Sequence, residues 1–275
     1  MGFMYVAAGL FNKTIADLLA PGVDLVFSSP APHSALDSWT SALAFTGQIY
    51  GDFAGYTEIA IGVALLLGFV LPVNFAFPYI SASPQDFWRR WHISLSTWLR
   101  DYLYISLGGN RGNNRLRNLF LTMLLGGVWH GASWTFVIWG GYHGLLLVIT
   151  HAVSRFAKPT QRVTQALSRA LGIVLTFYLV VIGWVFFRAP TLASAGRILR
   201  DMHHSAVASN VTHDSKVMLL LVVGAIPLCH LISALPRTSF FAKRGRLLLW
   251  PTAAILIVMS IFFGASGHAF IYFQF

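Results

Sequence analysis

The chain has 275 residues, of which 56% are hydrophobic and only 10% are charged. A water-soluble domain usually carries about 25% charged residues, so this composition excludes an ordinary soluble globular protein. The 19 Lys and Arg residues against 9 Asp and Glu give a formal net charge of +10, and the basic residues gather between apolar runs. This arrangement favours anionic lipid headgroups over nucleic acid as the partner of the positive charge.

Several apolar runs predict membrane-crossing helices. A helix needs about 20 residues to cross a hydrocarbon core of roughly 30 Å. Runs of this length predict spans over four segments, the first of them bent near Pro72: residues 59–77, 170–187, 217–235 and 247–265. Cys229 lies inside the third run, where an inert buried thiol is expected, and a single cysteine excludes an intrachain disulfide. We therefore expect an all-α protein, a polytopic transmembrane helix bundle forming one domain over residues 1–275.

Residues 84–107 show the pattern of an amphipathic helix at the membrane surface. Ser83 suits an N-cap and Pro84 a first helical turn. Aromatic residues and leucines recur at three- and four-residue spacing, while Arg89, Arg90 and Arg100 can reach headgroups or an anionic ligand. The sequence predicts one interfacial helix here.

The distribution of Lys and Arg predicts the orientation of the loops. Residues 81–117 hold six basic residues, and residues 151–169 and 236–246 hold four each. Since cytoplasmic loops are enriched in Lys and Arg, these three loops are predicted to be cytoplasmic. Residues 1–58 have only Lys13 and are predicted to lie outside, while residues 188–216, with four basic residues, leave their own side open.

A re-entrant hairpin around His130 follows from this orientation. Residues 118–150 would have to enter and leave the membrane on the same side, and two limbs of about 16 residues each rise only about 24 Å. His130 then lies at the apex, with apolar pieces at 118–129 and 131–150 on either side. Because an imidazole at bilayer depth is costly unless it is partnered or faces a wet cavity, His130 is a candidate functional residue.

Two segments carry a family resemblance. FWRRWHISLSTWLRDYLYISLGG (residues 87–109) and GGVWHGASWTFVIWGGYHG (126–144) resemble the signature region of the membrane-bound O-acyltransferase family. YGDFAGYTEIAIGVALLLGF (50–69), NFAFPYISAS (74–83) and FIYFQF (270–275) are similar to the branch that acetylates alginate. The similarity runs from about Phe11 to Phe275, and it implies that this chain corresponds to the C-terminal half of a longer family body, without the N-terminal half.

The resemblance implies roles for the two motif histidines. His130 matches the family histidine of acyl transfer, and an imidazole with an ordinary pKa of about 6.5 can take the proton of an attacking hydroxyl. His92 matches a second family histidine, expected on the donor side with Arg89 and Arg90 as anion partners. Both histidines have a simpler alternative: His130 as a helix-packing residue, and His92 as part of an ordinary interfacial helix.

Four further residues complete the predicted substrate-binding set. Arg100, Asp101 and Arg111 are similar to family positions, although Arg100 and Asp101 also suit a solvated helix face. Asp52, with Glu58, is expected to line an acceptor funnel or to orient His130, or simply to lie at the interface. No metal site is expected, because His203, His204 and His213 fit no standard zinc spacing.

The implied function is transfer of an acetyl group from a cytoplasmic thioester donor towards hydroxyls of an exported, alginate-like polysaccharide. Acetyl-CoA is the expected donor, with no bound cofactor. The expected partners are membrane lipids and either the exopolysaccharide or a periplasmic acetyl-transfer protein, in the bacterial inner membrane. The alternative is a non-catalytic acyl relay or scaffold component of a polysaccharide-modification complex.

Overall fold

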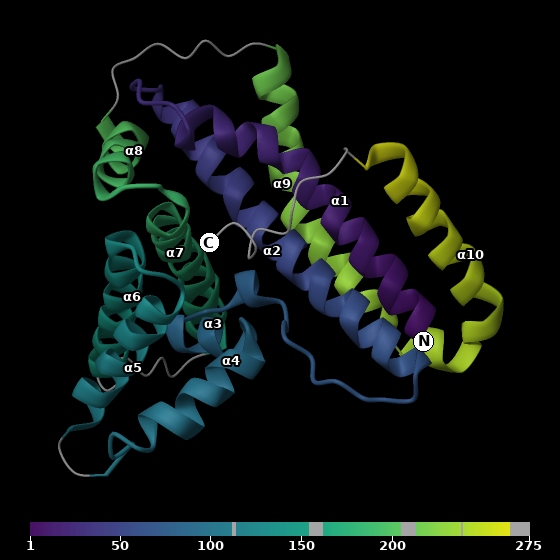
Figure 1. The fold of residues 1–275 in the computed structure, drawn as a ribbon, viewed down its shortest axis with the longest axis horizontal. Coiled ribbons are helices and arrows are strands. Elements are labelled where there is room, and N and C mark those ends of the chain that lie inside the picture. Colours follow the sequence, from purple (N-terminus) through teal and green to yellow (C-terminus); the bar gives the residue numbers. More distant parts are fainter. Residues whose placement is uncertain (112–113, 154–161, 205–212, 238, 265–275) are drawn as a thin grey trace. The chain divides into compact units, whose positions relative to one another are not determined.

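The computed structural model describes residues 1–111, 114–153, 162–204, 213–237 and 239–264. All regular structure in these residues is helical, which confirms the all-α prediction (Figure 1). The contacts group the chain into two compact units, one of residues 1–73 and 197–275 and the other of residues 74–196. The prediction of one domain over the whole chain stays a prediction.

The first unit contains long helices that pack side by side. They are α1 (Gly2–Phe27), α2 (Ala35–Leu66), α9 (His213–Ala234) and α10 (Ser239–Phe263), together with the greater part of α8 (Leu192–His204). α1 and α2 run antiparallel in close contact (Figure 1). A Cβ at Gly55 would lie only 2.6 Å from the carbonyl oxygen of Gly9, so glycine at this crossing permits the helix backbones to touch, as small residues do in membrane helix pairs.

The second unit holds the residues of both motif segments. It contains α3 (Pro84–Arg90), α4 (Ile93–Trp98), a π-helical turn (Leu99–Tyr104), α5 (Arg115–Trp129), α6 (Trp134–Val153) and α7 (Arg162–Arg188). α5 and α6 form an antiparallel pair, and α6 also packs against α7. The break between α5 and α6 falls at residues 130–133, so the predicted helical hairpin around His130 is present, and its re-entry into the membrane stays a prediction.

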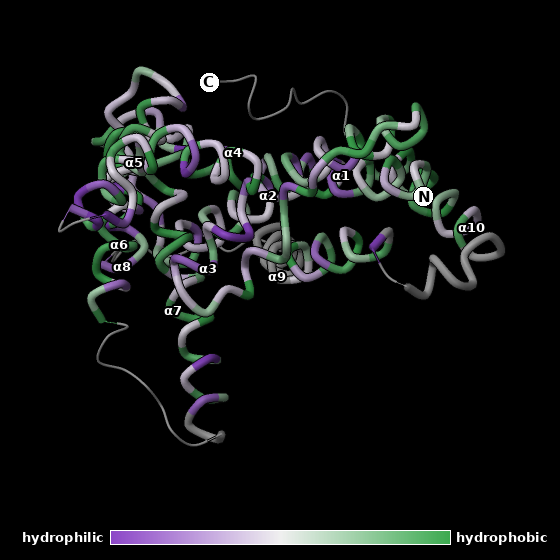
Figure 2. Tube along the Cα trace, turned by 90° about the horizontal axis from the view of Figure 1, so that it is seen from below, coloured by the Kyte–Doolittle hydropathy of each residue, from purple (hydrophilic) through white to green (hydrophobic). Residues whose placement is uncertain are grey.

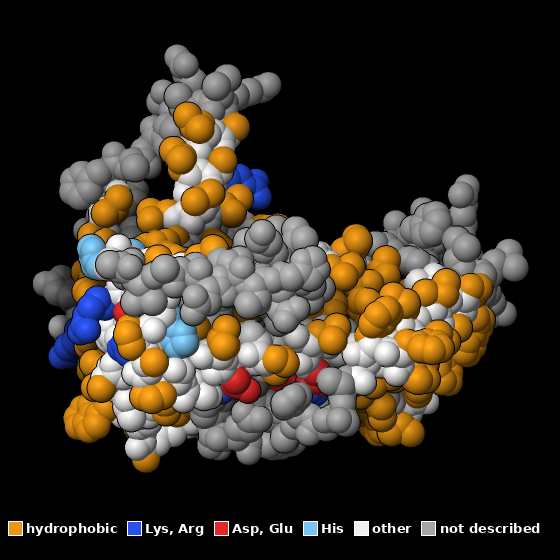
Figure 3. Space-filling model, turned by 90° about the horizontal axis from the view of Figure 1, so that it is seen from above, with side chains coloured by type: hydrophobic (Ala, Val, Ile, Leu, Met, Phe, Trp, Pro, Cys, Tyr) orange, Lys and Arg blue, Asp and Glu red, His pale blue; other side chains and the backbone are white. Residues whose placement is uncertain are grey.

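Membrane character is plain in the helices. Three of those in the described residues are long and apolar enough to cross a membrane, over Ala35–Leu66, Trp134–Val153 and Gln165–Arg188. Hydrophobic residues dominate the helical trace in Figure 2, and hydrophobic side chains cover much of the described surface in Figure 3. The predicted span at 170–187 lies within α7, and the runs at 217–235 and 247–265 fall largely within α9 and α10.

The predicted span at residues 59–77 is wrong in its boundaries. α2 begins 24 residues earlier, at Ala35, and ends at Leu66. Gly68 then takes a left-handed backbone with φ of +86°, and residues 69–77 contain no helix. Pro72 disfavours helical geometry at the residue before it, which keeps the chain extended here. The early start was missed because the first part of α2 is rich in small and polar residues that are buried against other helices.

The predicted single helix over residues 84–107 is also wrong, because the chain breaks at His92. α3 ends at Arg90, and α4 begins at Ile93. His92 lies between them with φ of +43° and ψ of +58°, a left-handed conformation that non-glycine residues seldom adopt. The side-chain periodicity of the segment is that of a helix, but its backbone forms three short helical pieces.

Candidate active site

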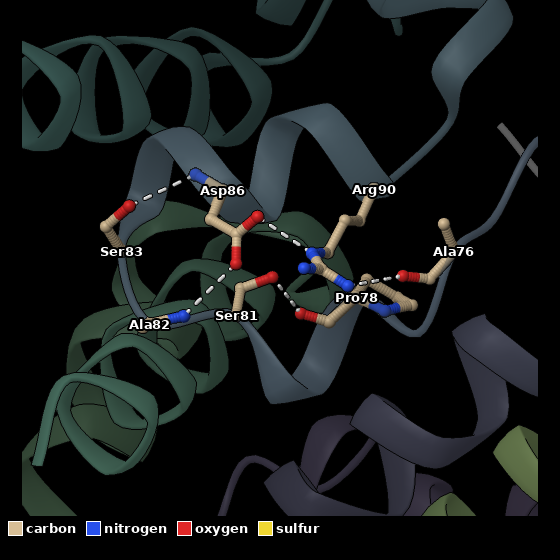
Figure 4. Close-up of polar contacts among 7 residues, drawn as sticks. All are labelled: Ala76, Pro78, Ser81, Ala82, Ser83, Asp86 and Arg90. Carbon is tan, nitrogen blue, oxygen red and sulfur yellow. Dashed lines mark hydrogen bonds and ion pairs between the residues drawn. The ribbon is translucent and has the colours of Figure 1, made fainter. Parts of the chain in front are cut away.

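α3 is held to the segment before it by a polar network (Figure 4). Ser83 caps the helix, since its hydroxyl accepts a hydrogen bond of 3.2 Å from the backbone N–H of Asp86. The Asp86 carboxylate accepts a 2.8 Å bond from Nε of Arg90, and Nη1 of Arg90 donates to the carbonyl oxygen of Ala76 at 3.2 Å. Arg90 therefore connects α3 to the non-helical segment around Ala76.

The left-handed conformation of His92 is stabilised by Asn74. The backbone N–H of Ile93 donates to the Asn74 carbonyl oxygen at 2.9 Å. The Asn74 side-chain oxygen accepts from the backbone N–H of Ser94 at 3.0 Å and from its hydroxyl at 2.7 Å. A strained backbone of this kind costs roughly 1–3 kcal/mol and persists only where its surroundings hold it, and such residues cluster at functional sites.

His130 follows the last turn of α5 and is surrounded by aromatic rings. Its imidazole contacts Trp129, Trp139 and Phe187 with ring centroids 5.1, 5.2 and 5.3 Å away, and Phe136 at 6.2 Å. Burial lowers the pKa of His130 to about 4. At neutral pH the imidazole is therefore uncharged, which is the form that a general base requires.

The two motif histidines are brought near each other. Burial, and after it the charge of His130, lower the pKa of His92 to about 4. An electrostatic effect of this kind requires proximity, although 37 residues separate the two in the chain. Nδ1 of His92 lies 3.4 Å from the hydroxyl of Ser94.

A close helix crossing positions His130. A Cβ at Gly140 of α6 would lie 2.6 Å from the Met123 carbonyl oxygen and 2.9 Å from Cα of Gly127 on α5. The two backbones thus meet three residues before His130, so glycine at these two positions fixes where the imidazole stands relative to α6.

A cavity of about 570 Å³ lies within the second unit. Its volume falls in the range of roughly 300–1,000 Å³ that is usual for small-molecule sites. The basic residues Arg89, Arg100, Arg115 and His151 line it, together with polar and apolar side chains: Gln85, Trp88, Ile93, Ser96, Thr97, Leu99, Tyr104, Asn110, Leu119, Thr122, Met123 and Leu147. Three guanidinium groups on one cavity suit an anionic ligand.

The structure separates the predicted substrate-binding residues into groups. Arg89 and Arg100 line the cavity, and Asp101 is bound to Arg100 by a 2.7 Å hydrogen bond that lowers the pKa of Asp101. Arg111 lies in the turn after this segment and does not line the cavity. Arg90 does not line it either and belongs to the network around Asp86.

Asp52 belongs to the first unit, unlike the other predicted site residues. Its carboxylate forms an ion pair of 3.3 Å with Lys13 of α1. Glu58, six residues after Asp52 on α2, accepts a 2.9 Å hydrogen bond from the Asn12 side chain. Glu58 also pairs with Arg237, which follows α9, at 3.9 Å. Both acidic residues thus have partners within the first unit, and their predicted roles towards an acceptor stay predictions.

Sequence reasoning missed Arg115 and the aromatic neighbours of His130. Arg115 was counted only as part of a basic loop, yet it begins α5 and lines the cavity. Trp139 and Phe187 looked like ordinary apolar helix residues, and only the folding of α6 and α7 brings them to His130. Among the described residues, no group of three or more His, Cys, Asp or Glu side chains gathers at a site that could hold a metal.

The comparisons with known proteins agree with this site. The model of the membrane-bound O-acyltransferase family matches residues 27–189, which include both histidines and every residue lining the cavity. The chain therefore belongs to the membrane-bound O-acyltransferase family, whose members are membrane proteins.

Proteins that act on several extracellular polymers are similar to this chain. The chain is 50% identical to the probable alginate O-acetylase AlgI of Pseudomonas aeruginosa, over 80% of this chain and 41% of that protein. It is 37% identical to the peptidoglycan O-acetyltransferase of Helicobacter pylori, over 100% of this chain and 56% of that protein. It is also 37% identical to the teichoic acid D-alanyltransferase of Bacillus subtilis, over 52% of this chain and 39% of that protein. The chain thus spans about half the length of these relatives.

Proposed function

We propose that this protein is an O-acyltransferase of the bacterial inner membrane. It moves an acetyl group from acetyl-CoA, a cytoplasmic thioester donor, towards hydroxyls of an exported, alginate-like polysaccharide. The observation that carries this proposal is the arginine-lined cavity in the same compact unit as His92 and His130. Both histidines lie within the family match.

The cavity suits the donor. Coenzyme A carries phosphate groups, and Arg89, Arg100 and Arg115 present guanidinium groups that bind phosphate oxygens in pairs. Ile93, the residue after His92, lines the same cavity. A donor anchored by its phosphates at the arginines can extend its thioester towards His92, which orients it.

His130 supplies the base. Its neutral imidazole accepts the proton of the acceptor hydroxyl as the hydroxyl oxygen attacks the thioester carbonyl carbon. The carbon–sulfur bond then breaks, and the thiolate takes up the proton, so that a thioester and an alcohol become an ester and a thiol. The buried rings of Trp139 and Phe187 pack against His130 and limit the access of water, which would otherwise hydrolyse the donor.

The relatives support an exported polymer as the final acceptor. Their names refer to alginate, peptidoglycan and teichoic acid, all of which lie outside the cytoplasmic membrane. The 50% sequence identity to AlgI over 80% of this chain favours an alginate-like polysaccharide. The acetyl group passes to the polymer directly or through a periplasmic transfer protein, with the enzyme embedded among membrane lipids.

Acetyl transfer in isolated membranes tests this function. Membranes containing the protein produced from its own gene are supplied with radiolabelled acetyl-CoA and a mannuronate oligosaccharide. We expect alkali-labile label on the oligosaccharide or on a co-purifying protein, and none with His130→Ala at equal protein level. Label that accumulates equally with the His130→Ala variant would instead indicate a relay or scaffold component whose chemistry resides elsewhere.

A further inference from the structure

Trp139 carries a buried hydrogen-bond donor beside His130. Its side chain is 2% exposed. Among the residues that the structure describes, no acceptor lies within hydrogen-bond distance of its indole Nε1. Trp184 on α7 is 1% exposed, and its indole N–H also has no hydrogen-bond acceptor among the described residues. Trp88, whose ring lies 5.7 Å from that of Trp139, also has a buried indole Nε1 without an acceptor. Three donors of one kind thus lie in one aromatic cluster, in which the Trp139 and Trp184 centroids are 6.1 Å apart.

A buried N–H without an acceptor is costly. Burial of an unsatisfied donor costs about 1–3 kcal/mol, and buried tryptophans usually find a partner for their N–H. Phenylalanine would fill much of the same space without this cost. Since the indole N–H can donate but not accept, the group that would satisfy it must be an acceptor such as a carbonyl oxygen.

The surroundings of Trp139 connect the cavity to the base. Its ring meets the His130 imidazole edge to face, at 5.2 Å and 88°. On another side it meets Trp88 at 5.7 Å and 71°, and Trp88 lines the arginine-rich cavity. Trp139 does not itself line the cavity, but it contacts both a residue of the cavity wall and the proposed base.

Trp184 differs in this respect. Among the described residues, its ring contacts are with Phe87, Trp91, Trp139, His143 and Phe187. Trp139 and Trp184 thus share near-complete burial and an N–H without a protein acceptor, and the contact with His130 is made by Trp139. This difference makes Trp184 a matched control.

We propose that the indole N–H of Trp139 donates a hydrogen bond to the carbonyl oxygen of the acyl donor. The proposal rests on the proposed acyltransferase function. As the acceptor oxygen attacks, the carbonyl π electrons move onto this oxygen, and the N–H stabilises the negative charge that develops there. When the carbonyl re-forms, the carbon–sulfur bond breaks and the thiolate leaves with the proton that His130 had taken.

Conservative replacement of the two tryptophans tests the contact. Removal of one donor to a developing oxyanion costs about 10²–10³-fold in kcat. We expect Trp139→Phe to lower kcat by a factor in this range with the acetyl-CoA KM unchanged. Trp184→Phe should leave kcat nearly unchanged. Both variants remove a similar volume of buried ring, so they should change the unfolding temperature by similar amounts, and a difference in kcat between them is then not a packing effect. A Trp139→Phe enzyme with wild-type kcat, or equal kcat losses in both variants, would overturn the proposal.

The carbonyl stretch of bound donor gives a second readout that a purely structural role would not move. In a His130→Ala background, which slows turnover, bound [1-¹³C]acetyl-CoA should absorb at lower frequency than the free donor, and Trp139→Phe should remove this shift. A carbonyl frequency equal to that of free donor would refute the hydrogen bond while leaving the acyltransferase function intact. If the wild-type protein neither binds nor consumes acetyl-CoA, the proposed function fails, and the Trp139 proposal fails with it.

Discussion

Arg89 and Arg90 are neighbours in the sequence but have different surroundings. Arg89 is exposed and lines the cavity, whereas Arg90 donates hydrogen bonds to Asp86 and to the carbonyl oxygen of Ala76. We expect Arg89→Ala to raise the acetyl-CoA KM with little change in stability. Arg90→Ala should instead lower the stability by about 1–2 kcal/mol, since partly exposed charged hydrogen bonds contribute at the lower end of their range. Donor titration and thermal unfolding of both variants measure this contrast. The reverse pattern would show that Arg90 is the ligand.

Alanine substitutions of His92 and of His130 should have different effects on kcat and KM. A group that acts only in the transition state lowers kcat, whereas one that binds substrate equally in ground and transition states changes KM. His130→Ala should therefore lower kcat by about 10²–10⁴-fold, the usual contribution of a general base. His92→Ala should mainly raise the acetyl-CoA KM. His204→Ala, at an exposed position on α8, is the control. Equal kcat losses with unchanged donor KM in the first two variants would place both histidines on one reaction centre.

The pH dependence of the reaction follows from the burial of these histidines. The pKa of each is lowered from 6.5 to about 4, so both stay neutral well below pH 6.5. We expect the acidic limb of kcat/KM to fall well below pH 6.5, the ordinary histidine value. Between pH 6.5 and 4 the unfolded chain binds more protons than the folded chain, so stability should decrease as the pH falls through this window. A kcat/KM profile with an acidic limb at 6.5 would mean that the reacting imidazole is hydrated rather than buried.

At the scale of elements, the break in the helix at His92 is a feature that could not be predicted from the sequence. The amphipathic spacing, the Ser83 cap and Pro84 at the first turn were read correctly. The break was not, because it depends on hydrogen bonds from Ile93 and Ser94 to Asn74, which lies 18 residues before His92. Local periodicity carries no information about such a contact. The helical hairpin at His130 was predictable, since basic loops on both sides of residues 118–150 and the apolar runs between them are visible in the sequence.

The crossing of α5 and α6 provides a test at the level of elements. A Cβ at Gly140 would meet backbone at 2.6 Å, whereas a Cβ at Gly141 would meet only the Leu124 side chain, at 3.7 Å. Gly140→Ala should separate the two helices, lower stability by about 1–3 kcal/mol as overpacking does, and reduce acetyl transfer because His130 moves. Gly141→Ala should change neither. The two variants are compared by unfolding temperature and by kcat, and indistinguishable behaviour would show that the crossing does not position His130.

At the scale of the whole molecule, the fold class could be predicted from the sequence, but which residues lie together at the site could not. Composition and apolar runs predict helices in a membrane, and these signals are strong because each needs only a local stretch of chain. Asp52 pairs with Lys13 in the first unit, and its predicted role towards an acceptor or His130 stays a prediction. Arg115 and Trp139 come to the site only through packing between helices, which single-sequence patterns do not encode.

Contacts within the first unit indicate the side of the membrane on which residues 197–204 lie, which the distribution of Lys and Arg did not predict. α8 is bound to the loop after α1: Arg197 donates to the carbonyl oxygens of Ser29 and Ala31 at 2.6 and 2.9 Å. The Asp201 carboxylate accepts from the backbone N–H of His33 at 3.1 Å. Residues 28–34 and residues 197–204 must therefore lie on the same side of the membrane. Because α1 and α2 are antiparallel and α2 leads towards the basic segment at 81–117, that shared side should be the periplasm.

Cysteine labelling tests this orientation. With Cys229 replaced by Ala, single cysteines are introduced at three exposed positions: Ser28 after α1, His204 on α8 and Ser106 in the basic segment. In intact spheroplasts a membrane-impermeant maleimide should label Ser28→Cys and His204→Cys, while Ser106→Cys should react only after the membrane is permeabilised. The positive-inside bias predicts the side of Ser106, and the hydrogen bonds of Arg197 and Asp201 require the other two to behave alike. Labelling of Ser106→Cys in intact spheroplasts would reverse the orientation and place the arginine-lined cavity on the wrong side for acetyl-CoA. Opposite behaviour of Ser28→Cys and His204→Cys would contradict the contact between α8 and the α1–α2 loop.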